Sequence, residues 1–266
     1  MDENNNSKLT GKDVTVVIPM YNSEATISNA LSSVYSQTAR PASIILIDDG
    51  STDGSVKITE QWAKNNQNIN VEIITIKNNG AANARNIGIN KVNTTLTAFL
   101  DADDTWQQDK IQKQLEILND ASYSPCNLVC TGSILRPITN KIIRITKKKL
   151  LIANLVSTSS VLAKTDVLKK FLFDTKLKRA EDYNLWLKIA TTDGGIINID
   201  SILLNYTIES SQNKLSNNQK EFHMDELKNF KLLYTEKYLS FFEYLFAILF
   251  STLKYIRRGI IKHANS

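Results

Sequence analysis

Short apolar runs alternate with amphipathic stretches over the first 120 residues of the chain. The apolar runs are rich in β-branched residues and bounded by turn residues, which is typical of buried strands. The stretches between them repeat apolar residues every three or four positions, which predicts helices with one buried face. The predicted strands are residues 14–18, 43–48, 71–76 and 95–100. Helices are predicted at 23–37, in a segment that ends near 66, after a loop within 80–92, and at 107–118. The first of them has an apolar face of Ile27, Ala30, Leu31 and Val34.

The ends of these elements carry recognisable signals. Pro19 is expected to end the first strand, and Ser23 can cap the helix that follows it through its side-chain oxygen. Repeated strand–helix units predict an α/β fold with a mainly parallel sheet flanked by helices. Ligands bind such sheets beyond the carboxyl ends of the strands, and polar clusters follow Ile18, Ile47 and Leu100 at those ends.

The segment FLDADDTW, residues 99–106, brings three carboxylates to the mouth of a buried strand. Asp101, Asp103 and Asp104 repel one another, and a divalent cation would relieve that repulsion. Carboxylate oxygens suit Mg²⁺ or Mn²⁺, which take one or two protein carboxylates together with substrate phosphates. A solvated acidic loop that caps the next helix is the alternative interpretation.

Composition narrows the possible functions. The 266 residues are 42% hydrophobic, enough for one large domain with a small appendage, and the net charge of +5 is too dispersed to indicate nucleic acid as a partner. The two cysteines, Cys126 and Cys130, are expected in the core, and with two histidines in the chain they cannot form a zinc set. The polar N-terminus is no signal peptide, so a cytoplasmic location is expected.

Five segments in this order resemble the family 2 glycosyltransferases of the GT-A fold, of the bacterial surface-polysaccharide type. They are VTVVIPMYNSEATISNAL, IILIDDGSTDGS, GAANARNIGI, FLDADDTW and EDYNLWLKIA, within about residues 13–206. The set is far more specific than any one segment. We therefore expect a flexible N-terminus (1–12), a GT-A catalytic domain (13–212) with a nucleotide-sugar half (about 13–105) and an acceptor half (about 106–212), and a helical tail (213–266).

The resemblance implies a binding site for the nucleotide of a UDP-sugar donor. Asp49 would accept a hydrogen bond from the uracil N–H, since a carboxylate only accepts, while Asp48 could be structural. Arg85 would lie near the base or the diphosphate, and a surface salt bridge is its alternative role. The residues expected to border the nucleotide after the first strand are Pro19, Tyr21, Asn22 and Glu24.

The same resemblance assigns roles within the D-x-D-D sequence. Asp101 and Ala102 would contact the donor, with Asp101 bonded to the ribose hydroxyls. Asp103 would hold the Mn²⁺ or Mg²⁺ ion that bridges the two phosphates. Asp104 extends the motif, and whether it binds the metal or orients Asp103 is left open.

The family places its general base in an acidic pair that opens a helix, here Glu181 and Asp182. Asp182 is the candidate base for an inverting displacement; the alternative is a pair of acids favoured by the helix dipole. The donor is expected to be UDP-hexose or UDP-N-acetylhexosamine, and the acceptor a glycan or a lipid-linked glycan. A non-catalytic nucleotide- or sugar-binding module is a competing hypothesis. A nucleotidyltransferase is another, although no Gly-rich phosphate loop follows the first strand.

Residues 121–180 match no recognisable pattern, although acceptor choice should depend on residues 130–185. A basic run with no acid between its members lies here: Arg136, Lys141, Arg144 and Lys147–Lys149. It is either a solvated loop or a surface for an anionic acceptor or a membrane.

The apolar run Leu239–Leu253 is too short to span a bilayer, which takes about 20 residues. Its helical spacing and the basic residues beyond it predict a helix in the interface of an anionic membrane, with the enzyme on the inner face of the cytoplasmic membrane. A helix packed on the catalytic domain is the alternative. The apolar positions are Phe242, Leu245, Leu249, Ile256 and Ile260, and the basic ones are Lys254, Arg257, Arg258 and Lys262.

Overall fold

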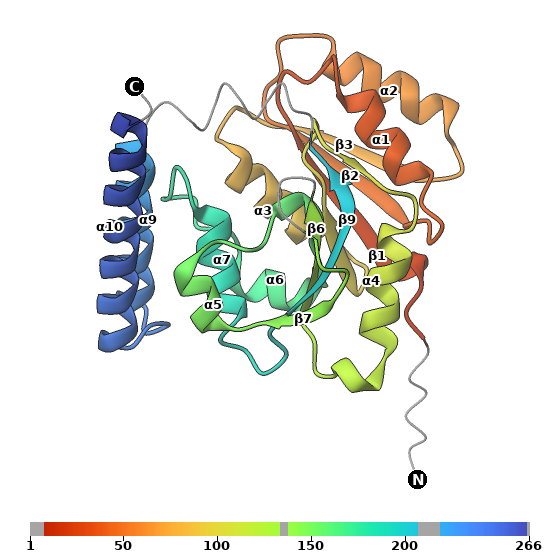
Figure 1. The fold of residues 1–266 in the computed structure, drawn as a ribbon. Helices are drawn as coiled ribbons and strands as arrows, with labels where there is room; N and C mark the ends of the chain where they lie inside the picture. The colour runs from red at the N-terminus through yellow and green to blue at the C-terminus, as the bar shows by residue number, and fades with distance from the viewer. Residues whose placement is uncertain (1–7, 134–137, 207–218, 265–266) are drawn as a thin grey trace.

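The computed structural model describes residues 8–133, 138–206 and 219–264, with side chains as far as Arg258 apart from that of Ser133. Of the predicted features, Arg136 and the side chains of Ile260 and Lys262 lie outside this described part. A central sheet is covered by helices on both faces, and two long helices stand at one side (Figure 1). The expected α/β fold is therefore confirmed.

The sheet has nine strands, eight of them in the order β3-β2-β1-β4-β8-β6-β9-β5, with β7 paired to β9. The first four strands are parallel neighbours, as are β6 and β9, whereas β8 joins the two groups in antiparallel fashion. The strands are β1 (Val14–Met20), β2 (Ser43–Asp48), β3 (Asn70–Thr75), β4 (Leu96–Phe99), β5 (Thr105–Trp106), β6 (Leu128–Ser133), β7 (Ile142–Ile145), β8 (Leu162–Lys164) and β9 (Ile196–Asn205).

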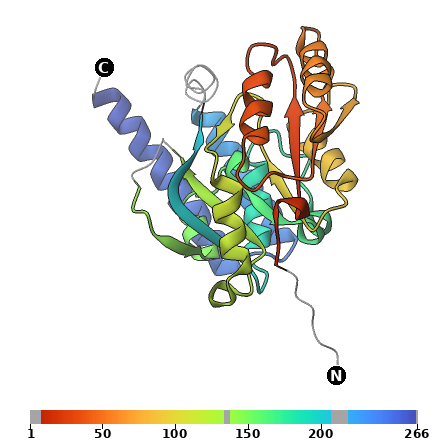
Figure 2. The ribbon, with the colours of Figure 1, turned by 90° about the vertical axis from the view of Figure 1, so that its right-hand side faces the viewer.

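The helices largely follow the predicted ranges and extend them into the second half of the chain. In Figure 2 the last of them, α10, crosses the side of the molecule away from β1. The helices are α1 (Ile27–Tyr35), α2 (Ser55–Asn65), α3 (Ala81–Lys91), α4 (Lys110–Asn119), α5 (Lys147–Ile152), α6 (Thr165–Phe171), α7 (Glu181–Ile189), α9 (Gln219–Thr235) and α10 (Phe241–Ala264), with short 3₁₀ turns at Gly11–Asp13, Ala121–Tyr123 and Thr158–Ser160.

Two residues expected to mark the ends of elements do not do so. Pro19 does not end β1, which continues to Met20. Alternate residues of β1 direct their peptide groups toward β4, and the pairing with β4 ends at Val17. The next residue on that side is Pro19, which has no N–H, but no paired strand lies there to accept one. Ser23 does not cap α1, because a turn over Ser23–Thr26 precedes the helix and Thr26 is the residue before its first turn.

Alternation along β1 divides the core into two layers. Val16 and Ile18 pack with α1 and α4 on one face, while Val17 packs with α3 on the other. Gly88 lets α3 approach this second face, because a Cβ there would lie 2.4 Å from Val17 Cγ1. The predicted apolar face of α1 is buried, and both cysteines are buried in the core, as expected.

The N-terminal segment is described from Lys8 onward. Leu9 donates its N–H to Asn119 Oδ1 (2.8 Å) and accepts a hydrogen bond from Asn119 Nδ2 (2.9 Å). These two bonds attach the chain before β1 to the end of α4.

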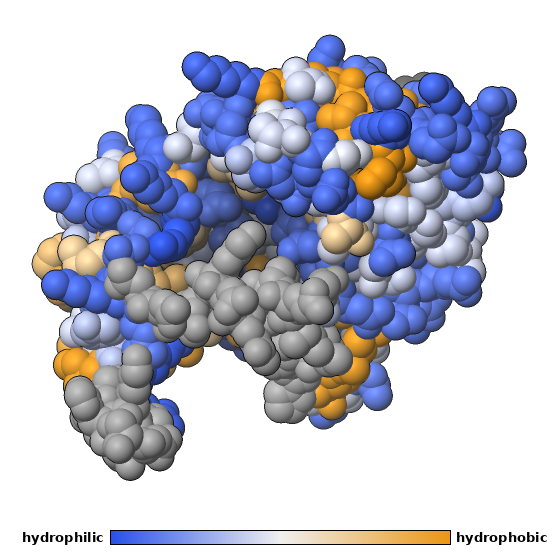
Figure 3. Space-filling view, turned by 90° about the horizontal axis from the view of Figure 1, so that it is seen from above, coloured by the Kyte–Doolittle hydropathy of each residue, from blue (hydrophilic) through white to orange (hydrophobic). Residues whose placement is uncertain are grey.

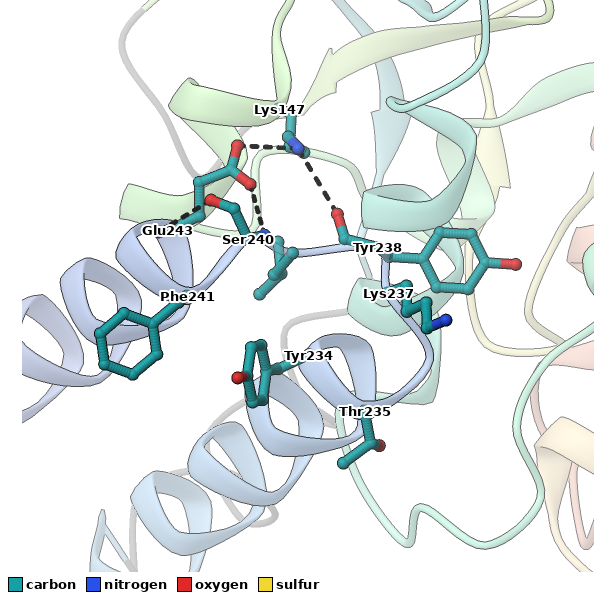
Figure 4. A pocket seen from close by; sticks show the side chains of 9 residues that line it. Lys147, Tyr234, Thr235, Lys237, Tyr238, Ser240, Phe241 and Glu243 are labelled. Atoms are coloured by element: carbon teal, nitrogen blue, oxygen red, sulfur yellow. Dashed lines mark hydrogen bonds and ion pairs between the residues drawn. The ribbon is translucent and has the colours of Figure 1, made fainter.

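Helices α9 and α10 form a pair that packs against α7 and α5 (Figure 1). Phe230, Leu233, Leu239 and Ala247 are buried in the same core layer as α7. At the turn between the two helices, Lys147 of α5 forms an ion pair with Glu243 (2.7 Å) beside a surface pocket (Figure 4). One face of the tail is thus part of the hydrophobic core. Among the described residues, none of the helices has the length and hydrophobicity that a membrane span requires.

Candidate active site

The loops that follow β1 and β2 are bound to each other by side chains. Asn22, with its backbone in the left-handed region (φ 46°), receives a hydrogen bond from Thr52 N–H on its Oδ1 (2.9 Å). Glu24 accepts the N–H of Gly54 (2.7 Å) and donates its own N–H to Asp53. Asn22 and Glu24 therefore fix the loop that leads into α2.

The two adjacent carboxylates after β2 are buried and serve different loops. Asp48 accepts the N–H of Ser51 (3.1 Å), which fits the structural role expected for it. Asp49 accepts the N–H groups of Asn79 (2.8 Å) and Gly80 (2.9 Å) with its two oxygens. The Asp49 carboxylate therefore holds the start of α3, and contact with a base would add to those bonds.

The FLDADDTW segment is held by hydrogen bonds to Ser159, in the second half of the chain. Asp101 donates its N–H to Ser159 Oγ (3.0 Å), and Trp106 Nε1 donates to the Ser159 carbonyl (2.7 Å). Ala102 and Asp104 are buried, whereas Asp101 and Asp103 are partly exposed. The alternation exposes Asp101 and Asp103, whereas Ala102, which was also predicted to contact the donor, is buried.

Arg85 of α3 connects the acidic segment to the start of α7. Its guanidinium is 6% exposed and lies 2.7 Å from Asp101 Oδ1 and 3.4 Å from Glu181 Oε1. Burial opposes its charge, but the carboxylates of Asp101 and Glu181 outweigh that effect and raise the pKa of Arg85. The arginine is thus a buried bridge and not a surface salt bridge.

Glu181 and Asp182 lie in the first turn of α7, and both residues are partly buried. Burial raises the pKa of the Asp182 carboxyl, although the Tyr183 N–H, Arg85 and Asn154 oppose the shift. Burial and the charge of Asp182 raise the pKa of Glu181, against the opposing charge of Arg85. Asn154 Nδ2 donates to Asp182 Oδ2 (3.2 Å), which orients the carboxylate. Raised carboxyl pKa values in a cavity are typical of acid–base sites.

One cavity of about 890 Å³ is lined by Arg85, Asp101, Asn154, Glu181 and Asp182. Figure 3 looks onto the face toward which β1 runs and shows a hollow bordered by hydrophilic residues. Three residues predicted for the site line the cavity: Arg85, Asp101 and Asp182.

The other predicted residues do not line this cavity. They are Pro19, Tyr21, Asn22, Glu24, Asp49, Ala102 and Asp103. Tyr21 is 51% exposed beyond the end of β1, and Ala102 and Asp103 belong to the loop that Asp101 opens. Their roles toward a donor stay predictions.

Sequence reasoning missed two residues of this arrangement. Asn154 lies within the part of the chain that matched no pattern, so no sequence signal marked it. Thr131, on β6, lines the cavity while its buried hydroxyl has no hydrogen-bond partner among the described residues.

The acidic loop fits a divalent cation that is completed by a substrate. No group of three or more Asp, Glu, His or Cys side chains able to hold a metal occurs among the described residues. Asp103 offers partly exposed hard oxygen donors, and one oxygen of Asp101 is occupied by Arg85. That donor set suits an ion that takes one or two carboxylates and fills its coordination with phosphates and water.

The chain belongs to glycosyl transferase family 2, whose model matches residues 15–155. It is therefore a glycosyltransferase, as the five sequence segments predicted, and its fold is the GT-A type.

Three relatives illustrate the range of the similarity. WfgD of Escherichia coli, a UDP-Glc:alpha-D-GlcNAc-diphosphoundecaprenol beta-1,3-glucosyltransferase, is 30% identical over 94% of this chain and 95% of its own. TuaG of Bacillus subtilis, whose name links it to teichuronic acid biosynthesis, is 38% identical over 45% of this chain, and the match spans only 46% of TuaG. The mannosyltransferase PcManGT of Pyrobaculum calidifontis, solved with GDP-Man and Mn²⁺, superposes with a TM-score of 0.65 at 18% identity, covering 91% of this chain and 73% of PcManGT.

Proposed function

We propose that the protein is an inverting glycosyltransferase that moves a hexose or N-acetylhexosamine from a UDP-sugar to a lipid-linked glycan in surface-polysaccharide synthesis. The observation that carries the proposal is the partly buried carboxylate of Asp182, hydrogen-bonded by Asn154, in a cavity that Arg85 and Asp101 also line. The similarity to WfgD over nearly the full length of both chains supports the donor and acceptor classes. The test is the mass of a lipid-diphosphate-linked acceptor, which should increase by one sugar residue; an acceptor unchanged with every UDP-sugar would contradict the proposal.

On the donor side, Asp49 and the residues after β1 would form the edge that meets the nucleotide. Asp101 would accept hydrogen bonds from the ribose, and its ion pair with Arg85 holds its carboxylate in place. Arg85 would in turn place a positive charge near the departing diphosphate, where negative charge develops as the anomeric bond breaks. Pro19, Tyr21, Asn22, Glu24 and Ala102 would complete the donor surface.

On the acceptor side, Asp182 would take the proton of the attacking hydroxyl. The raised pKa of its carboxyl makes it a stronger base once ionised than an ordinary aspartate. Its two oxygens accept hydrogen bonds from Asn154 and from the Tyr183 N–H, which orient the carboxylate, and a second lone pair on either oxygen can take the proton. A single displacement from the opposite face of the sugar would convert an α-linked donor into a β-linked product.

Asp103 would hold Mn²⁺ or Mg²⁺, which when bound supplies positive charge to the leaving diphosphate. We expect Asp103→Ala to lose metal-stimulated transfer while its free energy of unfolding stays equal or rises slightly, because one of three neighbouring negative charges is removed. UDP release is measured with excess EDTA and with added Mn²⁺ for the wild type and the variant. Wild-type activity that is equal in EDTA and in Mn²⁺ would contradict the metal assignment.

The tail supplies a surface for the membrane that contains such an acceptor. We call Phe242, Leu245, Phe246, Leu249, Leu253 and Ile256 the α10 stripe; they follow helical spacing and are 46–81% exposed. Arg257 and Arg258 are exposed next to its end. An apolar helix face beside cationic residues suits the interface of an anionic bilayer.

We expect Phe242→Ser/Leu249→Ser to weaken binding to vesicles that contain phosphatidylglycerol at least about tenfold, since each side chain would lose burial in the interface. Substitution is a sharper test than truncation, because Leu239 and Ala247 of the tail are buried in the core. The control is Ile142→Ser/Ile202→Ser, which changes two exposed apolar residues of the sheet, away from α10.

Binding is measured by co-sedimentation at low and high salt, and wild-type binding should weaken as salt rises. If the wild type fails to co-sediment at low salt, or if both double variants lose binding equally, the α10 stripe is not a membrane surface.

A further inference from the structure

The cavity that Asp182 lines is also lined by a group of cationic side chains, which we call the basic wall. Five cationic side chains from α5, α10 and the segment before α7 line this wall, and none of these elements carries a residue expected to contact the donor. They are Lys149, Lys178, Arg179, Lys254 and Arg258.

Two of the five are fixed by ion pairs with α9. Lys254 donates to Glu226 (3.1 Å) and to the Ile152 carbonyl (2.9 Å), which connects α10 to the end of α5. Arg179 lies 3.0 Å from Glu221. These bonds hold the elements that carry the other cations.

The remaining three are available to a ligand. Lys149, Lys178 and Arg258 are exposed, and none forms an ion pair with any residue that the structure describes. Like charges gathered at one wall raise the local potential and attract an anion. Lysine ammonium groups and the planar guanidinium of arginine both bind phosphate oxygens, the latter with two parallel bonds.

The position of this wall identifies the kind of anion. Helical spacing places Arg258 on the same side of α10 as the buried Ala247, so a molecule bound at the wall lies about one helix diameter, roughly 10–12 Å, from the α10 stripe. Asp182 lines the same cavity. A ligand with a sugar hydroxyl at Asp182, phosphates at the wall and an apolar chain along α10 satisfies all three surfaces.

We propose that Lys149, Lys178 and Arg258 form a binding site for the diphosphate of a polyprenyl-type, lipid-linked acceptor. This inference rests on the proposed function, because it assigns the acceptor side of the same cavity. The site is separate from the donor's diphosphate, for which Arg85 and Asp103 are the expected partners.

The test measures a second diphosphate site while the donor site is filled. Farnesyl diphosphate is titrated by calorimetry into the full chain in saturating UDP and Mn²⁺. We expect saturable binding that Lys149→Gln/Lys178→Gln/Arg258→Gln weakens at least about tenfold, because three charge-assisted contacts are lost. The control Lys57→Gln/Lys64→Gln/Lys91→Gln removes three exposed charges from α2 and α3 and should leave the affinity within about twofold.

Separate arms distinguish the possible failures. No binding of farnesyl diphosphate, or equal binding by the two triple variants, overturns the inference. Inorganic pyrophosphate that binds as tightly as farnesyl diphosphate overturns the lipid part of it. The affinity for UDP alone should be unchanged in both variants. A wild type that fails to bind UDP contradicts the proposed function instead, whatever the farnesyl diphosphate result.

Discussion

Asp182→Asn should lower kcat by about 10²–10⁴, because the amide cannot accept the proton of the acceptor hydroxyl. The substitution keeps the shape of the side chain, and its one carbonyl oxygen can keep the hydrogen bond from the Tyr183 N–H or from Asn154, which donate to different oxygens of Asp182. Binding of UDP should therefore stay within about twofold of wild type, so the loss appears in kcat and not in donor affinity.

The matched control is Asp200→Asn, which changes a carboxylate that lines the same cavity but accepts hydrogen bonds from Thr139. It should retain most of the wild-type activity. Turnover of Asp182→Asn close to that of Asp200→Asn would show that the base lies elsewhere.

The pH profile gives this prediction a second readout. A base works in its deprotonated form, and burial raises the pKa of Asp182. Activity should therefore fall, as pH is lowered, at a higher pH than an ordinary aspartate would give. This acidic limb should be absent from the residual activity of Asp182→Asn.

Arg85→Met should lower the free energy of unfolding by about 3 kcal/mol, the lower end of the cost of leaving a buried charge unpaired. The lower end applies because the Asp101 side chain is one-third exposed. Glu181, at 19% exposure, loses its cationic partner as well. Urea denaturation measures the change, and Arg40→Met, at an exposed arginine, should change the free energy by no more than about 0.5 kcal/mol.

The sign of the pH dependence separates this cause from lost packing. Without Arg85 the pKa values of the Glu181 and Asp182 carboxyls rise further, because its opposing charge is gone. Their ionised forms are then penalised at neutral and higher pH, and the penalty is relieved as pH falls and they protonate. A loss of stability that is equal at pH 8 and pH 5 would contradict an electrostatic origin.

The first half of the fold could be predicted because its signals are local. Strands β1 and β2 are mostly apolar, buried runs in a parallel sheet, and the face of α1 repeats at helical spacing. Four of the five motifs contain or follow one of these strands, so their place at the edge of the sheet followed from the order of strands and helices, whereas EDYNLWLKIA forms α7 in the second half.

The second half depends on contacts distant in sequence. Strand β8 has three residues and pairs with both β4 and β6, so its place is set by its neighbours and not by a pattern of its own. Asn154 could not be predicted for the same reason, because its role comes from a hydrogen bond to Asp182, 28 positions away. The helical spacing of the α10 stripe could be recognised in the sequence, but only the structure shows that the opposite side of α10, at Ala247, is buried.

Release of UDP in the presence and absence of acceptor tests the central claim most directly. A panel of UDP-sugars is offered to the full chain with Mn²⁺ and an N-acetylhexosamine linked to a lipid diphosphate. We predict that one donor gives UDP release that requires the acceptor and is lost in Asp182→Asn. Binding of UDP-sugars with no acceptor-dependent release from any of them would contradict a transferase and favour a binding module.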